Sequence, residues 1–398
     1  MGDLVYPPTH TAMISQPRRR FTASRHVVSS TAAALFTALA ACSSDGISNS
    51  MPQPPRGIIV LDGFIQPGLT FLGDTGSAST KLTLGPSTEF DAGGLSLLRD
   101  TVLAVSSRSA GDLLYVTDVR ASTTRRIQLP ARSNPSRARL LTGANGQTLI
   151  GVALRDSASI ALVSFAGAGP VSISRITNAG TCPTDLVQFD NAIWIVDANA
   201  NCRVNYAVQG DVRLIRVPNT GTTRDTILLP GLRGSGASVL VTGSEAFISA
   251  GGDANFASFP YTLIATGGIT KVDLRTRRVL VSKAMPANSY GAGVKLGLDG
   301  LLYVSLYQDL TSFTNRILKM RPADLSVLPS ASAEWVTLTT PSGAAVTCGS
   351  GQADALGRLH CIQNGTGSVT SLLVFSPSGT EVRRVAANQG GVDLAIRP

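Results

Sequence analysis

Four cysteines in the body of the chain are the residues whose type and spacing most directly predict chemistry. They are Cys182, Cys202, Cys348 and Cys361. Four cysteines allow three disulfide connectivities, and we favour Cys182–Cys202 with Cys348–Cys361 because each pair falls within one strand-and-turn block. Zinc is the alternative for such a set, but no CxxC pair is present and only one histidine, His360, lies in the same region. We therefore expect two disulfides and no zinc at these cysteines.

Carboxylates that could catalyse a reaction or bind a metal are few. The glutamates after residue 56 are Glu89, Glu245, Glu334 and Glu381. Glu245 and Glu381 lie beside expected turns, so only Glu89 and Glu334 are weak candidates for metal ligands. A nucleophile–histidine–acid triad would have only His360 available. We predict no catalytic residue and no cofactor, with a bound divalent cation as the alternative.

Aspartates recur where strands are expected to end. They include Asp62, Asp118, Asp197, Asp253 and Asp309. Aspartate at such positions commonly accepts hydrogen bonds from turn amides, which is the interpretation we favour. Binding of calcium or magnesium by several of them is the alternative.

The elements that must position these residues are short β-strands. The clearest strand–turn–strand block is Gly291–Asp309 (GAGVKLGLDGLLYVSLYQD), and related blocks begin at Thr184, Gly236 and Gly351. Hydrophobic residues make up 43% of the chain and charged residues 15%, a balance that excludes a disordered chain. The many glycines, together with alternating apolar runs, favour short strands joined by turns.

A unit of four expected strands recurs along the chain. The six complete units are Gly93–Pro130, Arg137–Thr177, Thr184–Pro230, Gly236–Lys283, Gly291–Leu328 and Ala345–Ala387. Gly57–Pro86 adds three strands and Gly391–Pro398 adds one, which together make a seventh unit from both ends of the chain. The spacing fits the roughly 40–50 residues of a propeller blade. We predict an all-β, seven-bladed β-propeller closed by the C-terminal strand, with six or eight blades as alternatives.

Three segments resemble blades of a known propeller superfamily. They are Gly297–Ser305 (GLDGLLYVS), Ile269–Ser282 (ITKVDLRTRRVLVS) and Leu372–Val385 (LLVFSPSGTEVRRV), and they are similar to the YVTN, NHL and SMP-30-like propellers. Lactonases of the SMP-30 type hold a divalent metal in the central channel through a Glu and Asn or Asp residues. The resemblance implies that Glu89 and Glu334 would be the channel ligands of such an enzyme, but no motif supports them.

Residues 1–41 resemble the signal peptide of a bacterial lipoprotein. Arg18–Arg20 form a positive segment, and the short apolar segment Val27–Ala41 ends in Leu39-Ala40-Ala41-Cys42, which is similar to a lipobox. The resemblance implies cleavage before Cys42, acylation of Cys42 (palmitate) and a lipidated tether at 42–56, in front of a propeller at 57–398. We expect a protein of the cell envelope, held in the outer membrane and facing the periplasm or the cell surface. Inner versus outer membrane, Sec versus twin-arginine export and a start at Met13 stay open.

The basic charge is modest and does not predict nucleic-acid binding. The formal net charge is +9, of which +3 belongs to residues 1–41, leaving about +6. The densest arginine group is Arg120, Arg125, Arg126, Arg132, Arg137 and Arg139. Basic clusters interleaved with aromatic residues, typical of nucleic-acid binding, are absent from the sequence. We interpret the group as a solvated strand edge, with contact to anionic lipid or polysaccharide as the alternative.

Long connections between the second and third strands of three neighbouring units indicate a binding face. They are Asp197–Asp211, Gly251–Gly268 and Gln308–Asn315. With neighbouring connections they would gather Tyr206, Phe256, Phe259, Tyr261, Tyr290, Phe313 and Trp335. Aromatic residues in loops suit contact with a protein or glycan partner, although they could also serve only to order their own loops.

We therefore predict a membrane-anchored binding or scaffold propeller that recognises a partner through this face. A propeller hydrolase, lactonase or lyase with a channel-bound divalent metal is one alternative. An accessory subunit of an envelope complex is the other.

Overall fold

The computed structural model describes residues 57–73, 79–90, 92–98, 100–106, 111–143, 145–165, 169–219, 224–234, 236–257, 259–328, 335–364, 370–387 and 390–397. The predicted signal peptide, Cys42, the tether and Glu334 lie outside these ranges. All the described residues belong to one unit of the chain. Within them, no helix is both long and apolar enough to cross a membrane.

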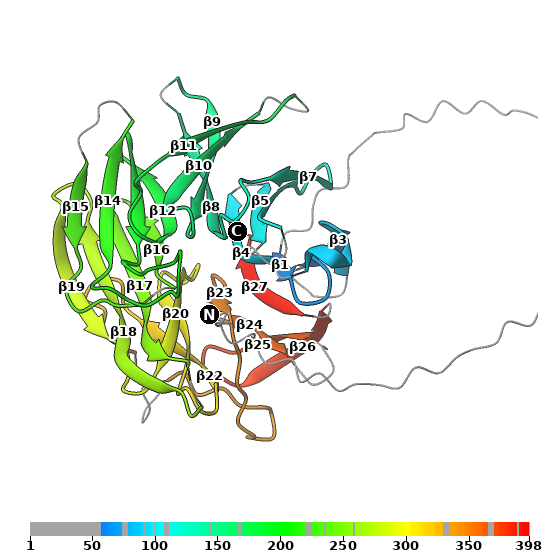
Figure 1. Cartoon of the computed structure of the whole chain (residues 1–398). Helices are drawn as coiled ribbons and strands as arrows, with labels where there is room; N and C mark the ends of the chain where they lie inside the picture. Colours follow the sequence, from blue (N-terminus) through cyan, green and yellow to red (C-terminus); the bar gives the residue numbers. More distant parts are fainter. Residues whose placement is uncertain are drawn as a thin grey trace, which may run out of the picture. The chain divides into compact units, whose positions relative to one another are not determined.

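Seven antiparallel sheets form the blades of a β-propeller, and their innermost strands contact one another around the ring (Figure 1). Blades 1 to 3, each from the axis outwards, are β4 (Ala92–Leu98), β5 (Thr101–Ser106), β6 (Leu113–Asp118), β7 (Thr123–Gln128); β8 (Pro135–Thr142), β9 (Thr148–Leu154), β10 (Ser159–Ser164), β11 (Ser172–Ile176); and β12 (Pro183–Phe189), β13 (Ala192–Asp197), β14 (Arg213–Pro218), β15 (Asp225–Leu228). The prediction of seven blades is confirmed.

The remaining blades continue the same order. Blades 4 to 7 are β16 (Ser238–Thr242), β17 (Glu245–Asn255), β18 (Thr262–Asp273), β19 (Arg278–Ala284); β20 (Tyr290–Leu296), β21 (Leu302–Tyr307), β22 (Asn315–Met320); β23 (Gly351–Ala353), β24 (Leu359–Asn364), β25 (Thr370–Phe375), β26 (Glu381–Ala387); and β27 (Gly391–Ile396), β1 (Gly57–Asp62), β2 (Gly68–Gly73), β3 (Ser79–Thr83). A single 3₁₀ turn, η1 (Ser87–Glu89), precedes β4.

Burial decreases from the middle of each blade to its outer edge. All six residues of β13 are buried, because a neighbouring sheet covers each face of that strand. The core therefore lies between blades: Trp194 of β13 packs in one cluster with Ile248 of β17. The outermost strands β11 and β19 are mostly exposed, which explains why their sequences are more polar.

The C-terminal strand closes the ring. In Figure 1, β27 lies beside β1, and the two pair antiparallel, with Ile58 opposite Ile396 and Val60 opposite Leu394. Val60 and Leu394 are almost completely buried. The predicted seventh blade, built from both ends of the chain, is confirmed.

Blade 5 differs from the prediction of four strands. Its sheet contains three strands, and the segment expected to form the fourth pairs only at Val327, through an isolated bridge to Met320. Leu325 has a φ of +57°, in the left-handed region, which interrupts an extended strand just before that bridge.

Both favoured cysteine pairs are joined. Cys182 and Cys202 form a disulfide with Cα atoms 5.4 Å apart, and Cys348 and Cys361 form the other, at 6.0 Å. The first ties the start of β12 to the connection between β13 and β14. The second ties the segment before β23 to β24. Both bonds therefore hold a blade near the axis, where the chain enters its innermost strand.

Replacing Cys182 and Cys202 together by alanine should lower the free energy of unfolding by about 3 kcal/mol, since the bond restricts the unfolded chain. Urea unfolding under oxidising conditions measures the difference. With the thiols reduced, the variant and the wild type should differ much less, because the wild type then lacks the bond too. Equal stability of the two oxidised proteins would contradict the prediction.

Candidate functional site

The innermost strands place five charged residues around the central channel. They are Arg137, Arg139, Lys295, Asp185 and Asp393. Charged side chains close to an axis lined by sheets lose much of their hydration and therefore require partners. The three cations outnumber the two carboxylates, so the lining of the channel carries a positive excess.

Asp393 of β27 links five blades. Its Oδ1 accepts hydrogen bonds from Lys295 Nζ at 2.5 Å and Ser350 Oγ at 2.9 Å. Its Oδ2 accepts from Arg137 Nη1 and from the Leu95 backbone N–H, both at 3.2 Å. These partners belong to or immediately precede innermost strands of blades 5, 6, 2 and 1. One carboxylate on the closing strand therefore connects the ring across the channel.

The charge state of Asp393 follows from these contacts. The residue is 7% exposed, and burial alone would favour its neutral form. The Lys295 ammonium and the Arg137 guanidinium outweigh burial and hold the pKa of the Asp393 carboxyl well below its usual range. Asp393 is therefore ionised at neutral pH.

A second ion pair joins blades 2, 3 and 4. Arg139 donates to Asp185 from Nε at 3.0 Å and from Nη2 at 2.7 Å. The same carboxylate accepts from the Val239 backbone N–H at 3.0 Å, and Arg139 Nη2 donates to the Val239 carbonyl at 3.1 Å. Burial lowers the pKa of Arg139, but Asp185 raises it by more, so the pKa lies above its ordinary value.

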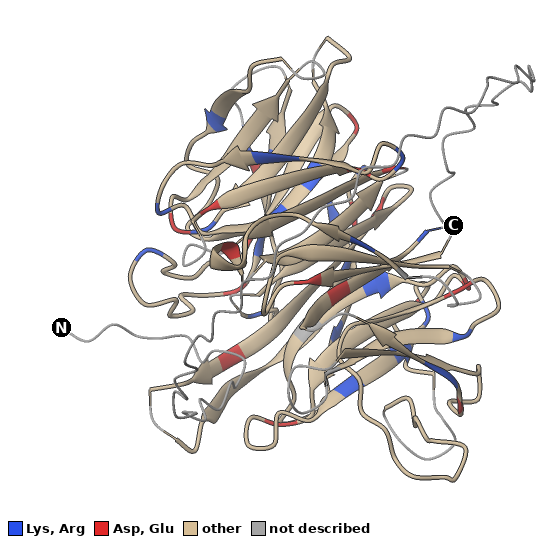
Figure 2. Cartoon of the chain, turned by 90° about the vertical axis from the view of Figure 1, so that its right-hand side faces the viewer, with Lys and Arg blue, Asp and Glu red and all other residues tan. Residues whose placement is uncertain are grey.

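The arginine group predicted as a solvated strand edge is instead dispersed. Arg137 and Arg139 lie on β8, the innermost strand of blade 2, where they pair with channel carboxylates. Arg120 pairs with Asp100 and Arg126 with Glu89. Figure 2 shows basic and acidic residues interspersed over the propeller. These arginines are close together in the sequence because they lie on or beside consecutive strands, but the fold places them in different surroundings.

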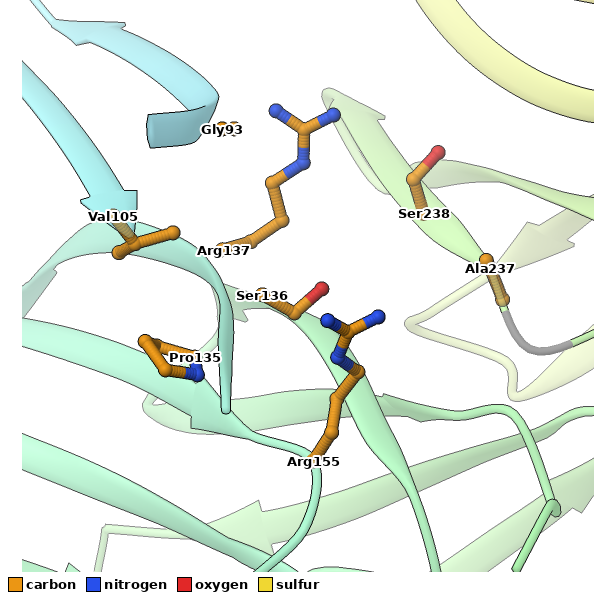
Figure 3. Close-up of a pocket in the computed structure, with 10 residues that line it drawn as sticks. Gly93, Val105, Pro135, Ser136, Arg137, Arg155, Ala237 and Ser238 are labelled. Carbon is orange, nitrogen blue, oxygen red and sulfur yellow. The ribbon is translucent and has the colours of Figure 1, made fainter. Parts of the chain in front are cut away.

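A cavity of about 290 Å³ opens at one end of the channel (Figure 3). Its lining includes Gly94, Ser136, Arg137, Arg155 and Ser238, which come from blades 1, 2 and 4. All of these residues lie on the same face of the propeller. On that face the chain enters the innermost strand of each blade, and the connection between the second and third strands also lies there. The cavity therefore opens on the face predicted for binding.

Backbone geometry at Gly94 keeps the cavity open. Its φ is +69°, and a Cβ there would lie 2.7 Å from the Ser136 carbonyl oxygen and 3.1 Å from Arg137 Cδ. Only glycine can adopt this positive φ and also avoid a clash with the Ser136 carbonyl oxygen and Arg137. The close approach of blades 1 and 2 at this end therefore depends on a residue without a side chain.

Arg155 follows β9 and supplies the second guanidinium of the cavity. Its Nη2 donates to Asn134 Oδ1 at 3.0 Å, and Arg155 Cζ lies 5.8 Å from the ring centroid of Tyr206. Arg155 Nε is buried and has no hydrogen-bond partner within the described ranges. Tyr206 OH donates to Asp156 Oδ1 at 2.6 Å, and burial together with this bond raises the pKa of Tyr206 to about 12.

The predicted loop Gly251–Gly268 is largely a hairpin. β17 and β18 stay paired out to Asn255 opposite Thr262, so these two strands are longer than those of the other blades. The apolar and small residues of this stretch continue the alternating pattern of a strand. The several glycines among them favoured the prediction of a loop. The hairpin therefore projects its tip from the face that carries the cavity.

Five of the predicted aromatic residues meet around the tip of this hairpin. Phe256 makes edge-to-face contacts with Tyr261 and Tyr290, with ring centroids 5.2 and 5.3 Å apart. Tyr261 also contacts Phe259 at 5.6 Å and Phe313 at 6.0 Å. We call these five residues the aromatic cluster. It joins the hairpin of blade 4 to blade 5, and Phe259 at its edge is 70% exposed.

The other two predicted aromatic residues lie elsewhere. Tyr206 belongs to the surroundings of Arg155, and Trp335 packs against the core of blade 5. The structure adds Tyr307, whose ring centroid lies 5.5 Å from that of Phe313. Tyr307 ends β21 and directly precedes the connection Gln308–Asn315, and this position in the sequence could have predicted its contact with Phe313.

Glu89, a weak metal candidate, is placed away from the innermost strands. It accepts hydrogen bonds from Tyr115 OH at 3.2 Å and Arg126 Nε at 2.8 Å, and these partners lie on the third and fourth strands of blade 1. In the described part of the chain, no group of three or more His, Cys, Asp or Glu residues is arranged to hold a metal.

Other polar residues singled out in the sequence make local contacts. Asp118 accepts from the backbone N–H groups of Arg120 and Ala121, and Asp309 accepts from those of Thr311 and Ser312, as expected for strand-end aspartates. His360 Nε2 lies 3.0 Å from Asp354 Oδ2, and burial lowers the pKa of His360.

Comparisons with known proteins bear on the fold. No protein-family model matches the chain, and no curated protein matches it. A solved structure of a protein from Lactobacillus plantarum is similar, with a TM-score of 0.54, 14% identity, and coverage of 85% of this chain and 98% of that one. A candidate 6-phosphogluconolactonase from Bacteroides fragilis is also similar, with a TM-score of 0.52, 12% identity, and coverage of 88% and 99%. At such low identity the likeness concerns the fold alone.

Replacing Asp393 by asparagine should destabilise the folded protein by about 3 kcal/mol at neutral pH, because Lys295 and Arg137 would keep uncompensated charges on largely buried side chains. Asp225, whose side chain is 36% exposed in its ion pairs with Arg216 and Arg277, provides the control. Asp225→Asn should cost at most about 1 kcal/mol.

The effect of Asp393→Asn should also depend on pH. Folding lowers the pKa of Asp393, so its stabilising contribution is present above the pKa of an unfolded aspartate, about 3.9, and is lost as the pH falls below that value. Urea unfolding of both proteins between pH 7 and pH 3 measures this. A stability difference that stays constant over this range would contradict the assignment.

Proposed function

We propose that this protein is a lipid-anchored recognition module of the bacterial cell envelope. Its propeller binds a partner protein through the aromatic cluster on the face that carries the hairpin. The chain would belong with the YVTN, NHL and SMP-30-like propellers as a binding member rather than an enzyme.

The envelope location is supported by the N-terminal sequence and by the disulfides. Cys42 ends a segment similar to a lipobox, and β1 begins at Gly57, soon after it. Fully extended, the intervening residues could span at most ~50 Å, so the propeller would stay close to the membrane. Two disulfides fit an oxidising compartment outside the cytoplasm.

The observation that carries the proposed binding role is the exposed apolar tip of an extended hairpin. Phe259 is 70% exposed and Ile264 63% exposed, although both lie on a hairpin that is otherwise well paired. Tyr261 contacts Phe259 and is itself contacted by Phe256. An exposed apolar residue held by an ordered cluster loses little conformational entropy on binding, which is typical of an interface anchor.

The chemistry of the tip favours a protein over a glycan. The phenyl ring of Phe259 and the alkyl chain of Ile264 have no hydrogen-bonding groups, and both are mostly exposed. A glycan binds mainly through its hydroxyl groups, whereas Phe259 and Ile264, the large exposed hydrophobic residues of the tip, offer only apolar contacts. The tip therefore suits an apolar pocket on a partner protein.

The metal-dependent hydrolase is less well supported. Glu89, the one described metal candidate, already has its charge compensated by Arg126 and accepts a hydrogen bond from Tyr115.

Replacing Phe259 by alanine should reduce binding of the partner at least tenfold, because interface anchors of this type often contribute 2 kcal/mol or more. The measurement is crosslinking in intact cells through a photoreactive residue at Ile264, followed by identification of the attached protein. Binding of the purified partner to wild type and variant then gives the affinities.

Leu356 provides the matched control for Phe259→Ala. It is 69% exposed and lies in the turn between β23 and β24, on the opposite face of the propeller from Phe259. Leu356→Ala should leave partner binding unchanged, and neither variant should shift the unfolding midpoint appreciably. Equal loss in both variants, or crosslinks only to polysaccharide, would contradict the proposal.

Cys42 should carry the lipid. Mass analysis of the protein from native membranes should find acyl chains on an N-terminal Cys42, and Cys42→Ser should release the propeller from the membrane fraction. A mature chain that begins elsewhere and carries no lipid would refute the anchor but leave the partner-binding experiment unaffected.

A further inference from the structure

We propose that the cavity at the mouth of the channel binds a small molecule that carries a carboxylate or phosphate group. Arg137 and Arg155 would hold that anionic group. The proposal goes beyond recognition of a partner protein, because it uses neither the aromatic cluster nor the lipid anchor.

The charge of the cavity points to an anion. Two guanidinium groups, those of Arg137 and Arg155, contribute to its lining, and none of the residues that line it is acidic. Two like charges at one cavity repel each other, and in the described part of the chain only Arg137 of this pair has a carboxylate partner, Asp393. The positive excess of the channel strands adds to this attraction.

Both guanidinium groups keep donors available. Asp393 and the Leu95 carbonyl engage only Nη1 of Arg137, so within the described ranges Nε and Nη2 of Arg137 have no partner. Arg155 donates from Nη2 to Asn134, and its Nη1 has no acceptor within those ranges. Guanidinium N–H groups that face a cavity without a protein acceptor remain available to form charge-assisted hydrogen bonds with a ligand. An oxyanion would supply the missing acceptors.

The two arginines are held in place before any ligand arrives. Asp393 binds Arg137 from the channel side, and the backbone of Gly94 leaves room for its side chain. Asn134 and the ring of Tyr206 hold Arg155. Prior ordering of this kind lowers the entropic cost of binding.

The remaining lining adds neutral polar groups. Figure 3 shows the guanidinium of Arg155 beside the hydroxyl of Ser136, with Ser238 on the opposite side of the cavity. Ser238 Oγ lies 2.9 Å from Ser249 Oγ, and either can donate, so Ser238 can also donate to a ligand when it accepts from Ser249. Hydroxyl groups and guanidinium forks together recognise carboxylates and phosphates.

The volume limits the ligand to a small molecule. The volume of about 290 Å³ lies just below the usual range of ligand cavities, roughly 300–1,000 Å³. A polymer such as a nucleic acid or an anionic polysaccharide could place no more than a terminal group there. Carboxylate and phosphate share the required chemistry, and the experiment separates them.

Isothermal titration of the full-length protein in detergent micelles tests the proposal. Inorganic phosphate and succinate are the two anionic probes, at low ionic strength, and glycerol is the neutral control. We expect at least one anion to bind and glycerol not to bind, and the tighter anion identifies the ligand type. Absence of binding by both anions at millimolar concentration would overturn the proposal.

Substitutions locate the binding. Arg155→Met should weaken binding of the anion at least tenfold, because the variant loses charge-assisted hydrogen bonds. Arg275 is the control. It is an exposed residue in the turn between β18 and β19, on the face of the propeller opposite to the cavity. Arg275→Met should leave the affinity unchanged, and an equal loss in both variants would show general attraction by charge and overturn the site.

A conservative variant covers the case in which Arg155→Met does not fold. Arg155→Lys keeps the charge but loses the planar fork, so it should weaken binding less than Arg155→Met yet measurably. If Arg155→Met does not fold, unchanged affinity in Arg155→Lys alone would overturn the proposal. Phe259→Ala should bind the anion as the wild type does, so failure of this site and failure of the proposed partner surface can be told apart.

Discussion

The structure depends on the neutralisation of one buried carboxylate at the point where the ring closes. Asp393 lies on β27, the last strand of the chain, and its partners come from four other blades. A buried charge without partners is costly, so the final strand is stable in the channel only when those blades already surround it. The ion pairs thus favour the complete ring over partly assembled arrangements, in addition to the apolar contacts between sheets.

The architecture could be predicted because it is repetitive. The same strand-and-turn pattern recurs in every blade, so an error in one unit, such as the weak fourth strand of blade 5, does not alter the overall prediction. The closing strand was recognisable because Gly57–Pro86 lacked one strand that Gly391–Pro398 could supply. The local disulfide pairing followed from the same reasoning, since each cysteine pair falls within one block.

The cavity and the charged lining of the channel could not be predicted from the sequence, and the reasons are physical. Gly94, Ser136 and Ser238 lie on three different blades, and they meet only through the curvature of the ring. Arg137 and Arg139 alternate with apolar residues, and an exposed strand has the same pattern as one that lines a channel. The aromatic cluster was easier to anticipate because its residues lie in adjacent connections, whereas Tyr206 turns towards blade 2 to bind Asp156.

The position of β1 has a mechanical consequence. Although β1 begins the propeller, it is not an edge strand, because β27 pairs along one side and β2 along the other. A pull on the N-terminal segment is therefore resisted by two ladders of backbone hydrogen bonds at once, and it cannot peel the blade from its edge. Because one of these ladders joins β1 to the C-terminal strand β27, part of a force applied to the N-terminal segment is transmitted to the C-terminal strand. The closing strand thus serves as a clamp on the segment through which the propeller would be tethered.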